Sequence, residues 1–278
     1  MDNKHHPRAD QLLYHYVTII IRNFGIIKFI CLPGKIMTKQ PTSTEGPPTD
    51  EGFIPHLAVD AVIFGFHDRQ LKVLMMRYSK THLHALPGGF IRKNENLDDA
   101  AKRVASERTG LTDIFLEQFH VFGDLARHDP SPFASFMIAN GAQPDAGHWL
   151  LQRFISVGYF ALVDFTRVTP TPDKIFDSCG WYDLNALPPL IQDHTAIVNK
   201  ALQSLRIMLD DKLIGFNLLP EDFTMGDLQS LYETILGKRL LRPAFQRKML
   251  SMGILERIAK KYSGGAHKAP YLYRFVSK

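Results

Sequence analysis

Residues 88–111, GGFIRKNENLDDAAKRVASERTGL, carry the signals of a capped amphipathic helix. Asn96 is a favourable N-cap, Asp99 would complete a pair resembling a capping box, and Gly110 stands where a left-handed C-cap is expected. The apolar residues between these ends recur at helical spacing: Leu97, Ala100, Ala101, Val104 and Ala105. The segment therefore predicts a helix with one apolar and one polar face.

Several residues of this segment fall at the spacings of the Nudix box, G-x5-E-x7-R-E-U-x-E-E-x-G-U, in which U is a bulky aliphatic residue. The residues in register are Gly89, Glu95, Arg103, Glu107, Gly110 and Leu111. The chain resembles the Nudix superfamily across this box. The resemblance implies that Glu95 and Arg103 brace the loop against the helix, as they do in active relatives.

The box is degenerate, because Val104 and Arg108 stand where two glutamates are expected. Offsets of three and four place such carboxylates on one helical face, where a cluster can hold Mg²⁺, neutralise a diphosphate and position water. Glu107 beside a guanidinium is a poor magnesium site, because Arg108 competes for the same oxygens. We therefore expect impaired catalysis, with no assigned catalytic residue and no cofactor. If a distant carboxylate compensates, the chain is a diphosphate hydrolase that uses Mg²⁺, with Glu107 as a ligand.

Charge and cysteine content restrict the function further. Residues 238–278 hold eleven Lys and Arg against one acidic residue, Glu256, a net charge of +10, whereas the rest of the chain has a net charge of −5. One end of the protein is thus suited to an anionic partner. Two cysteines, Cys31 and Cys179, are too few for a disulfide framework, which favours a reducing compartment and a cytoplasmic location.

The first 52 residues are predicted to be a disordered tail. Residues 12–32 are apolar but interrupted by basic side chains, so no run is long enough to span a bilayer, and no membrane partner is expected. Residues 37–52 are polar and rich in proline. Met37 is the preferred start of translation, which would place residues 1–36 upstream of it; a peripheral membrane anchor is the alternative.

Residues 53–211 follow the element order of a Nudix α/β/α sandwich, an α+β fold with a mixed sheet. β-Rich stretches predict strands at residues 57–66, 71–77, 115–122, 153–164 and the start of 179–190. HDRQ, residues 67–70, is the expected turn between the first two strands, and residues 122–147 are expected to be turn-like throughout. Apolar periodicity predicts a final helix over residues 194–211.

Residues 212–278 are predicted to form a winged helix-turn-helix domain. Thr224 is the expected N-cap of its first helix, which Gly237 ends. The other predicted elements are a second helix at residues 242–252 and two strands at residues 254–261 and 271–276. A helix in the major groove and a basic wing on the backbone suit duplex DNA.

The candidate DNA-binding residues lie on the second helix and at the tip of the hairpin: Arg242, Gln246, Arg247, Lys248, His267 and Lys268. The preceding helix carries Asp227 and Glu233 instead, so the cations gather on the two elements that would face DNA. A protein-interaction domain whose cations are merely solvated is the alternative.

The two halves together resemble the Nudix-related transcriptional regulators, which join an N-terminal Nudix domain to a C-terminal winged helix. The similarity covers roughly residues 53–278. Besides the box, it rests on RFISVGYFALVD (153–164), GWYDLNALPPLIQDH (180–194), FTMGDLQSLYETILGKRLLRPAFQRKML (223–250) and PYLYRF (270–275). This combination is far more specific than the box alone.

The resemblance implies a function. Members of this family act as dimers that repress or activate genes of NAD or sugar metabolism, and their Nudix domains sense ADP-ribose, other nucleotides or a sugar. A homodimeric DNA-binding regulator with a small-molecule effector is therefore expected. The candidate effector-binding residues are Arg77, Arg92, Glu107 and Arg108. The loss of metal ligands favours a sugar or sugar phosphate slightly over a magnesium-bound diphosphate.

Alternatives remain at this stage. A Nudix hydrolase of a nucleoside diphosphate derivative is the competing function, and Glu107 is the only clustered box carboxylate left to support it. Arg77 has a second interpretation as a surface residue at a strand edge. The aromatic and imidazole side chains without a ligand pattern are interpreted as packing, structural or surface groups: Trp149, Trp181, His120, His128 and His194.

Overall fold

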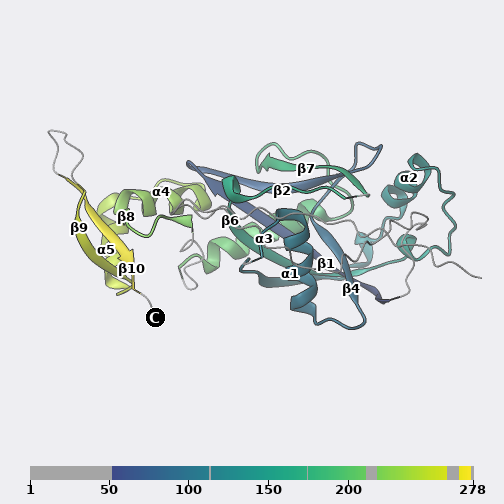
Figure 1. The fold of residues 1–278 in the computed structure, drawn as a ribbon, viewed down its shortest axis with the longest axis horizontal. Helices are drawn as coiled ribbons and strands as arrows, with labels where there is room; N and C mark the ends of the chain where they lie inside the picture. Colours follow the sequence, from purple (N-terminus) through teal and green to yellow (C-terminus); the bar gives the residue numbers. More distant parts are fainter. Residues whose placement is uncertain (1–51, 113, 174, 211–217, 262–268, 277–278) are drawn as a thin grey trace, which may run out of the picture. The chain divides into compact units, whose positions relative to one another are not determined.

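A computed structural model describes residues 52–112, 114–173, 175–210, 218–261 and 269–276. Its centre is a mixed sheet of seven strands (Figure 1). The strands are β1 (Phe53–His67), β2 (Gln70–Tyr78), β3 (His84–Ala85), β4 (Gly88–Arg92), β5 (Glu117–Phe122), β6 (Ile155–Asp164) and β7 (Phe176–Asp183). Their order is β3-β2-β1-β6-β5, with β4 paired to β1 and β7 paired to β2. β1 and β6 are parallel, and the other pairs are antiparallel.

Helices cover both faces of this sheet. The side chains of a strand alternate between its faces, and along β1 they join different hydrophobic clusters: Val59, Ala61 and Ile63 pack with α1 (Leu97–Thr109), whereas Val62, Phe64 and Phe66 pack with α3 (His194–Met208). The expected α/β/α sandwich is therefore confirmed. The predicted strands are also confirmed, although most of their ends differ from the predicted bounds by a few residues.

The turn between β1 and β2 is tighter than predicted. His67 pairs directly with Gln70, which leaves only Asp68 and Arg69 in the turn. Both have positive φ, 47° and 61°, as a two-residue type I′ hairpin requires.

The prediction that residues 122–147 are turn-like throughout is wrong. They contain η1 (Leu125–Arg127) and the helix α2 (Ser131–Ala139). Asp129 accepts a hydrogen bond from the Ser131 amide at 2.9 Å, and proline is tolerated in a first helical turn. Phe133 and Phe136 of α2 pack on the ring of Tyr78. The Asp and Pro residues that suggest a loop thus begin a helix, because tertiary contacts stabilise it.

The ends of α1 confirm one predicted cap and correct another. Gly110 has a φ of 70° and donates its amide to the Ser106 carbonyl, as a left-handed C-cap does. Asn96 is the N-cap residue, but its side chain accepts no backbone amide and instead donates to Asp99 at 2.9 Å. The expected capping box is therefore absent from this helix.

The C-terminal elements form the predicted winged helix. They are β8 (Phe223–Thr224), α4 (Met225–Leu236), α5 (Arg242–Ser251), β9 (Leu255–Lys260) and β10 (Tyr271–Phe275), and the sheet order is β8-β10-β9. Thr224 and Asp227 form a reciprocal capping box at the start of α4, and Gly237 ends it with a φ of 68°. These local signals decide the helix ends as expected.

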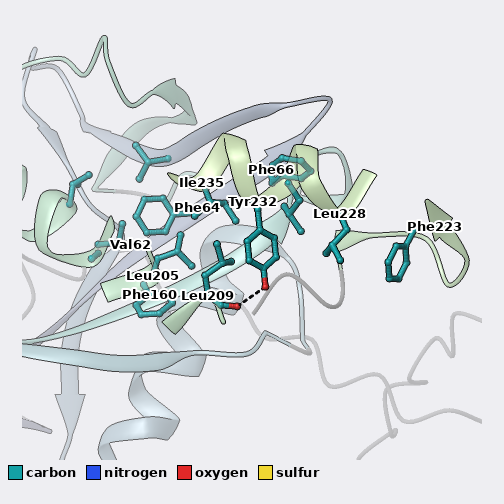
Figure 2. Packing of buried hydrophobic residues seen from close by; sticks show 14 of the residues in the cluster. Val62, Phe64, Phe66, Phe160, Leu205, Leu209, Phe223, Leu228, Tyr232 and Ile235 are labelled. Atoms are coloured by element: carbon teal, nitrogen blue, oxygen red, sulfur yellow. Dashed lines mark hydrogen bonds between the residues drawn. The ribbon is translucent and has the colours of Figure 1, made fainter. Parts of the chain in front are cut away.

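One hydrophobic cluster continues from the sheet through α3 into the winged helix (Figure 2). Leu205 and Leu209 lie among Phe64, Phe160 and Ile235 in this cluster. The Tyr232 hydroxyl donates to the Leu209 carbonyl at 3.3 Å, and Arg206 Nε donates to the Ile235 carbonyl at 2.9 Å. The Nudix-like fold and the helix α4 are thus packed together through α3.

Some predictions lie outside the described residues. These are the tail to residue 51, the predicted domain boundary between residues 211 and 212, and the wing residues His267 and Lys268. The division of the chain at residue 211 therefore stays a prediction. Among the helices that are described, none has the length and apolar character needed to cross a bilayer.

Candidate functional site

The loop of the Nudix box is locked to the helix α1. Arg103 donates to both oxygens of Glu95, at 3.0 and 2.7 Å, and to the Phe90 carbonyl at 2.8 Å. Glu95 also accepts the Arg92 amide at 2.7 Å. The Arg103 hydrogen bond, more than any other contact, lowers the pKa of Glu95. A bidentate pair of this kind fixes both charge and direction, so the expected brace is present.

Val104, which stands where the box has its first clustered glutamate, faces the core. Val104 is 2% exposed and belongs to a cluster with Ile91 and Val157. A Cβ atom added at Gly89 would lie 2.7 Å from Val104 Cγ2, closer than two carbons can pack. Val104 therefore occupies space beside β4 that is available only because residue 89 is a glycine.

The remaining box carboxylates do not form a metal site. The Glu107 side chain is 47% exposed and lies 3.7 Å from Arg103 Nη1, while Glu95 is occupied by the same arginine. No group of three or more His, Cys, Asp or Glu suitable for a metal ion occurs in the described part of the chain. Mg²⁺ needs several oxygen ligands in octahedral geometry, and one carboxylate beside a guanidinium does not fit it.

Arg108, one of the predicted effector-binding residues, is largely buried in an ion pair. Its side chain is 10% exposed, donates to Asp173 at 2.5 Å and lies over the Phe176 ring at 5.5 Å. The backbone carbonyl of Arg108 also accepts the Thr171 amide at 3.1 Å. Arg108 therefore connects the segment before β7 to the end of α1, and its role in effector binding stays a prediction.

The other predicted effector-binding residues fall into two separate settings. Arg77 pairs with Asp177 at 2.8 Å, and this hydrogen bond is the main cause of the lowered pKa of Asp177. Arg77 thus belongs with Arg108 on the segment around β7. Arg92 is exposed at the end of β4 and, with Glu107, borders the brace. The four predicted effector-binding residues thus lie in two groups, and their role in ligand binding stays a prediction.

Sequence reasoning missed a cluster of half-buried aromatic rings beside the box. Phe90, directly after Gly89, lies 4.5 Å from the Trp149 ring, 5.3 Å from Phe154 and 5.8 Å from Phe53. Trp149 also stacks on Phe53 at 6.3 Å. We call these four rings the aromatic cluster. These rings come from separate segments, so no spacing pattern connects them in the sequence. Trp149 was expected to be a packing residue, and it packs against the other three rings.

A buried polar network lies next to the aromatic cluster. Arg127 donates to both oxygens of Asp193, at 3.0 and 3.1 Å, to the Phe154 carbonyl at 2.7 Å, and lies 3.8 Å from Asp60. His194 Nδ1 accepts the Leu86 amide at 3.0 Å. The network therefore ties the start of α3 to the strands around the box. His194 is buried, which agrees with its interpretation as a structural group.

The buried His194 predicts a pH dependence of stability. Burial lowers its pKa below the ordinary 6.5, although Asp60 and Asp193 oppose the shift. The fold keeps the imidazole neutral while the unfolded chain gains a proton below about pH 6.5, so the free energy of unfolding should fall between about pH 7.5 and 5.5. Urea unfolding at several pH values measures this decline, and His194→Gln should reduce it.

The exposed His120 provides the matched control for that measurement, because His120→Gln removes an imidazole that solvent already reaches. This control should keep the decline of the unmodified protein. Parallel curves for the unmodified protein and His194→Gln would show that His194 does not contribute.

The described cations of the winged helix are exposed on and around α5. Arg242 and Arg247 of α5 are exposed to solvent, and Gln246 is half-buried. Lys248 is also exposed but pairs with Asp210 at 2.5 Å. Further exposed cations flank the helix; they belong to the basic segment 238–278 but were not named as DNA-binding candidates: Lys238, Arg239, Arg257 and Lys260. Arg257 and Lys260 lie over the Tyr271 ring, at 4.4 and 5.6 Å.

The fold and these surfaces define a class of protein: a Nudix fold whose box lacks a carboxylate cluster, joined to a winged helix with an exposed basic face. Comparison with known proteins agrees. The family model for the NUDIX domain matches residues 54–204, and the model for the NrtR DNA-binding winged helix domain matches residues 215–275.

Individual relatives show the same arrangement. The ADPR responsive transcriptional repressor NtrR of Acinetobacter baylyi is 30% identical over 229 residues, which cover 80% of this chain and 82% of the relative. The crystal structure of Shewanella oneidensis NrtR with a 27mer DNA matches with a TM-score of 0.57 and 27% identity, over 79% of this chain and 93% of that one. A MutT/nudix family protein of Enterococcus faecalis shares the fold, with a TM-score of 0.59 and 21% identity over 84% of this chain and 90% of that one.

The chain belongs to the NrtR family of Nudix-related transcriptional regulators. This membership confirms the expected family and the expected α+β fold. The protein is a DNA-binding transcriptional regulator whose Nudix domain senses a small metabolite.

Proposed function

We propose that this protein represses transcription from the cytoplasm as a homodimer and that ADP-ribose, bound by its Nudix domain, changes its affinity for DNA. The observation that carries the proposal is the continuous core between the Nudix fold and the winged helix, through α3. The A. baylyi relative is described as ADPR responsive, which supports ADP-ribose over the sugar that the degenerate box suggested. A dimer would present two winged helices to a palindromic site.

The aromatic cluster is the proposed binding site for the adenine base. Its four rings are half-buried and border β4, the strand that begins the box. Aromatic faces stack on planar bases, and ligand sites combine such apolar surface with a few polar groups. Arg92 is exposed at the end of the same strand and supplies a cation for a diphosphate. Arg77 and Arg108 are already paired with carboxylates and are not included.

We also propose that the Nudix domain binds its effector without hydrolysing it. Incubation of the protein with ADP-ribose and Mg²⁺ should release no AMP and ribose 5-phosphate above the uncatalysed rate, because the described residues offer no magnesium cluster. Chromatography of the products measures the outcome. Turnover that Glu107→Gln abolishes would contradict the proposal and establish Glu107 as a metal ligand.

The proposed DNA surface predicts the effect of a single substitution. Arg247→Ala should weaken binding to duplex DNA and reduce the slope of log affinity against log salt by about 0.9, the contribution of one phosphate contact. Arg247 is exposed and forms no ion pair with any described residue, so its loss should leave folding intact. Fluorescence anisotropy with a labelled duplex at several salt concentrations measures both quantities.

Lys200→Ala is the control for this substitution. Lys200 is exposed on α3 and carries the same charge outside the winged helix. It should leave the salt slope unchanged. Equal slopes for Arg247→Ala and the unmodified protein would place the DNA contact elsewhere.

A further inference from the structure

One cation of the proposed DNA surface already has an internal partner. Lys248 lies on α5 and donates to Asp210, two residues beyond the end of α3. The two side chains are 50% and 41% exposed, so a DNA phosphate can reach the same ammonium. Arg247, the neighbouring residue on α5, forms no ion pair within the described residues. Lys248 is thus distinguished by its partner rather than by its exposure.

The contact between Asp210 and α5 borders a pocket that is open to solvent. The pocket, of about 220 Å³, lies beside the ion pair and is lined by Tyr232, Leu240, Phe245 and the pair itself, among others. The Tyr232 hydroxyl donates to the Leu209 carbonyl, and the Asp210 carboxylate lies close enough to this hydroxyl to raise the pKa of Tyr232, after the larger effect of burial.

The neighbouring contact with α4 differs. There, Leu205 and Leu209 of the α3 end pack with Ile235, and Arg206 binds the Ile235 carbonyl. The helix α4 is therefore held by apolar packing and a partly buried hydrogen bond, whereas Lys248 is held by an exposed ion pair at the edge of the pocket. An exposed pair of this kind is weak and exchanges with competing ions.

We propose that Asp210 is an autoinhibitory residue that competes with DNA phosphate for Lys248. This inference rests on the proposed DNA contact of α5. In the DNA-free protein the carboxylate occupies the ammonium. A phosphate that binds Lys248 must displace this carboxylate or lie beside its negative charge, and either event reduces DNA affinity. Asp210, which follows α3, thereby lowers the affinity of the basic surface for DNA.

A double-mutant cycle on the full chain tests the competition. The variants are Asp210→Asn, Lys248→Gln and the pair together, and the probe is a labelled mixed-sequence duplex of about 30 base pairs, which accommodates two half-sites one turn apart. Asp210→Asn should tighten binding about two- to five-fold at low salt, the size that one exposed ion pair supports. In the Lys248→Gln background the same substitution should change nothing, because the competed ammonium is gone.

Two outcomes would overturn the inference. An equal gain from Asp210→Asn in both backgrounds would mean that Asp210 repels DNA in general, and no gain in either would mean that the ion pair does not restrain Lys248. Asp183→Asn provides the control for charge alone, since Asp183 is 68% exposed on the Nudix sheet. It should leave DNA affinity unchanged. Thermal unfolding of every variant verifies that affinities are compared between folded proteins.

The same data separate this inference from the proposed function. If Arg247→Ala weakens DNA binding and Lys248→Gln does not, α5 still contacts DNA and only the competition is wrong. If neither substitution weakens binding, the assignment of α5 as the DNA-binding helix is wrong and the inference falls with it.

Discussion

Saturating ADP-ribose is expected to change the affinity of the protein for its selected DNA site by about 5- to 150-fold, a coupling free energy of about 1–3 kcal/mol. A ligand shifts DNA binding only if it binds the DNA-competent and DNA-incompetent states with different free energies. The shared core through α3 provides the physical connection between the two domains. The DNA is first selected by the protein from a random pool, and its affinity is then measured with and without ADP-ribose.

Linkage supplies an internal check of this prediction. The affinity for ADP-ribose must change by the same factor when DNA is bound, because the coupling is reciprocal. Calorimetric titration of the protein and of its DNA complex measures this factor. ADP-ribose that raises the melting temperature but leaves DNA affinity unchanged would contradict coupling for this ligand.

Variants of the aromatic cluster locate the effector in the same experiment. Trp149→Ala should weaken ADP-ribose binding while leaving DNA affinity in its absence unchanged, since the ring stacks beside β4 and not on the winged helix. Phe115→Ala is the control, because Phe115 is 56% exposed and lies outside the cluster. Unchanged ADP-ribose affinity in Trp149→Ala would place the base elsewhere.

The second large effect concerns stability. Arg127→Ala is expected to lower the free energy of unfolding by about 3–5 kcal/mol, because it leaves the carboxylates of Asp60 and Asp193 without their cation. The Arg127 side chain is 6% exposed and binds both oxygens of Asp193 and the Phe154 carbonyl. Urea unfolding monitored by circular dichroism measures the loss.

Arg77→Ala is the matched control for Arg127→Ala. It removes the same side chain from another Arg–Asp pair, with Asp177, but both partners are more than a third exposed. Solvent screens such a pair, and the expected loss is below about 1 kcal/mol. Similar losses for the two variants would mean that burial does not strengthen the Arg127 network.

Local signals in the sequence predicted most of the elements, because they act over a few residues. Thr224 with Asp227, and Gly237 after α4, specify a helix whose ends the structure reproduces. The β-rich apolar run along β1 likewise predicts a strand, and the structure buries it on both faces. The helix α2 was not predicted, because local signals do not include contacts with distant residues. Its aromatic side chains pack on Tyr78, which is far away in the sequence.

The candidate site was less predictable than the fold. The resemblance to the Nudix box correctly paired Glu95 with Arg103, which lie within one loop and helix. Spacing placed Arg108 on the polar face of this helix but gave no sign of its partners, Asp173 and Phe176, which come from a distant segment. A helix turn determines which way a side chain points, but only the segments packed against it determine what that side chain meets.

By itself, the sequence indicated the family, most of the elements and the loss of two box carboxylates, since each is written in residue types at fixed spacings. The tertiary structure decided which charges are free. It paired Arg77, Arg108 and Lys248 with Asp177, Asp173 and Asp210, and it assembled the aromatic cluster and the Arg127 network from separate segments. Coulomb energies and stacking depend on distances of a few ångströms, and such distances between remote residues exist only after folding.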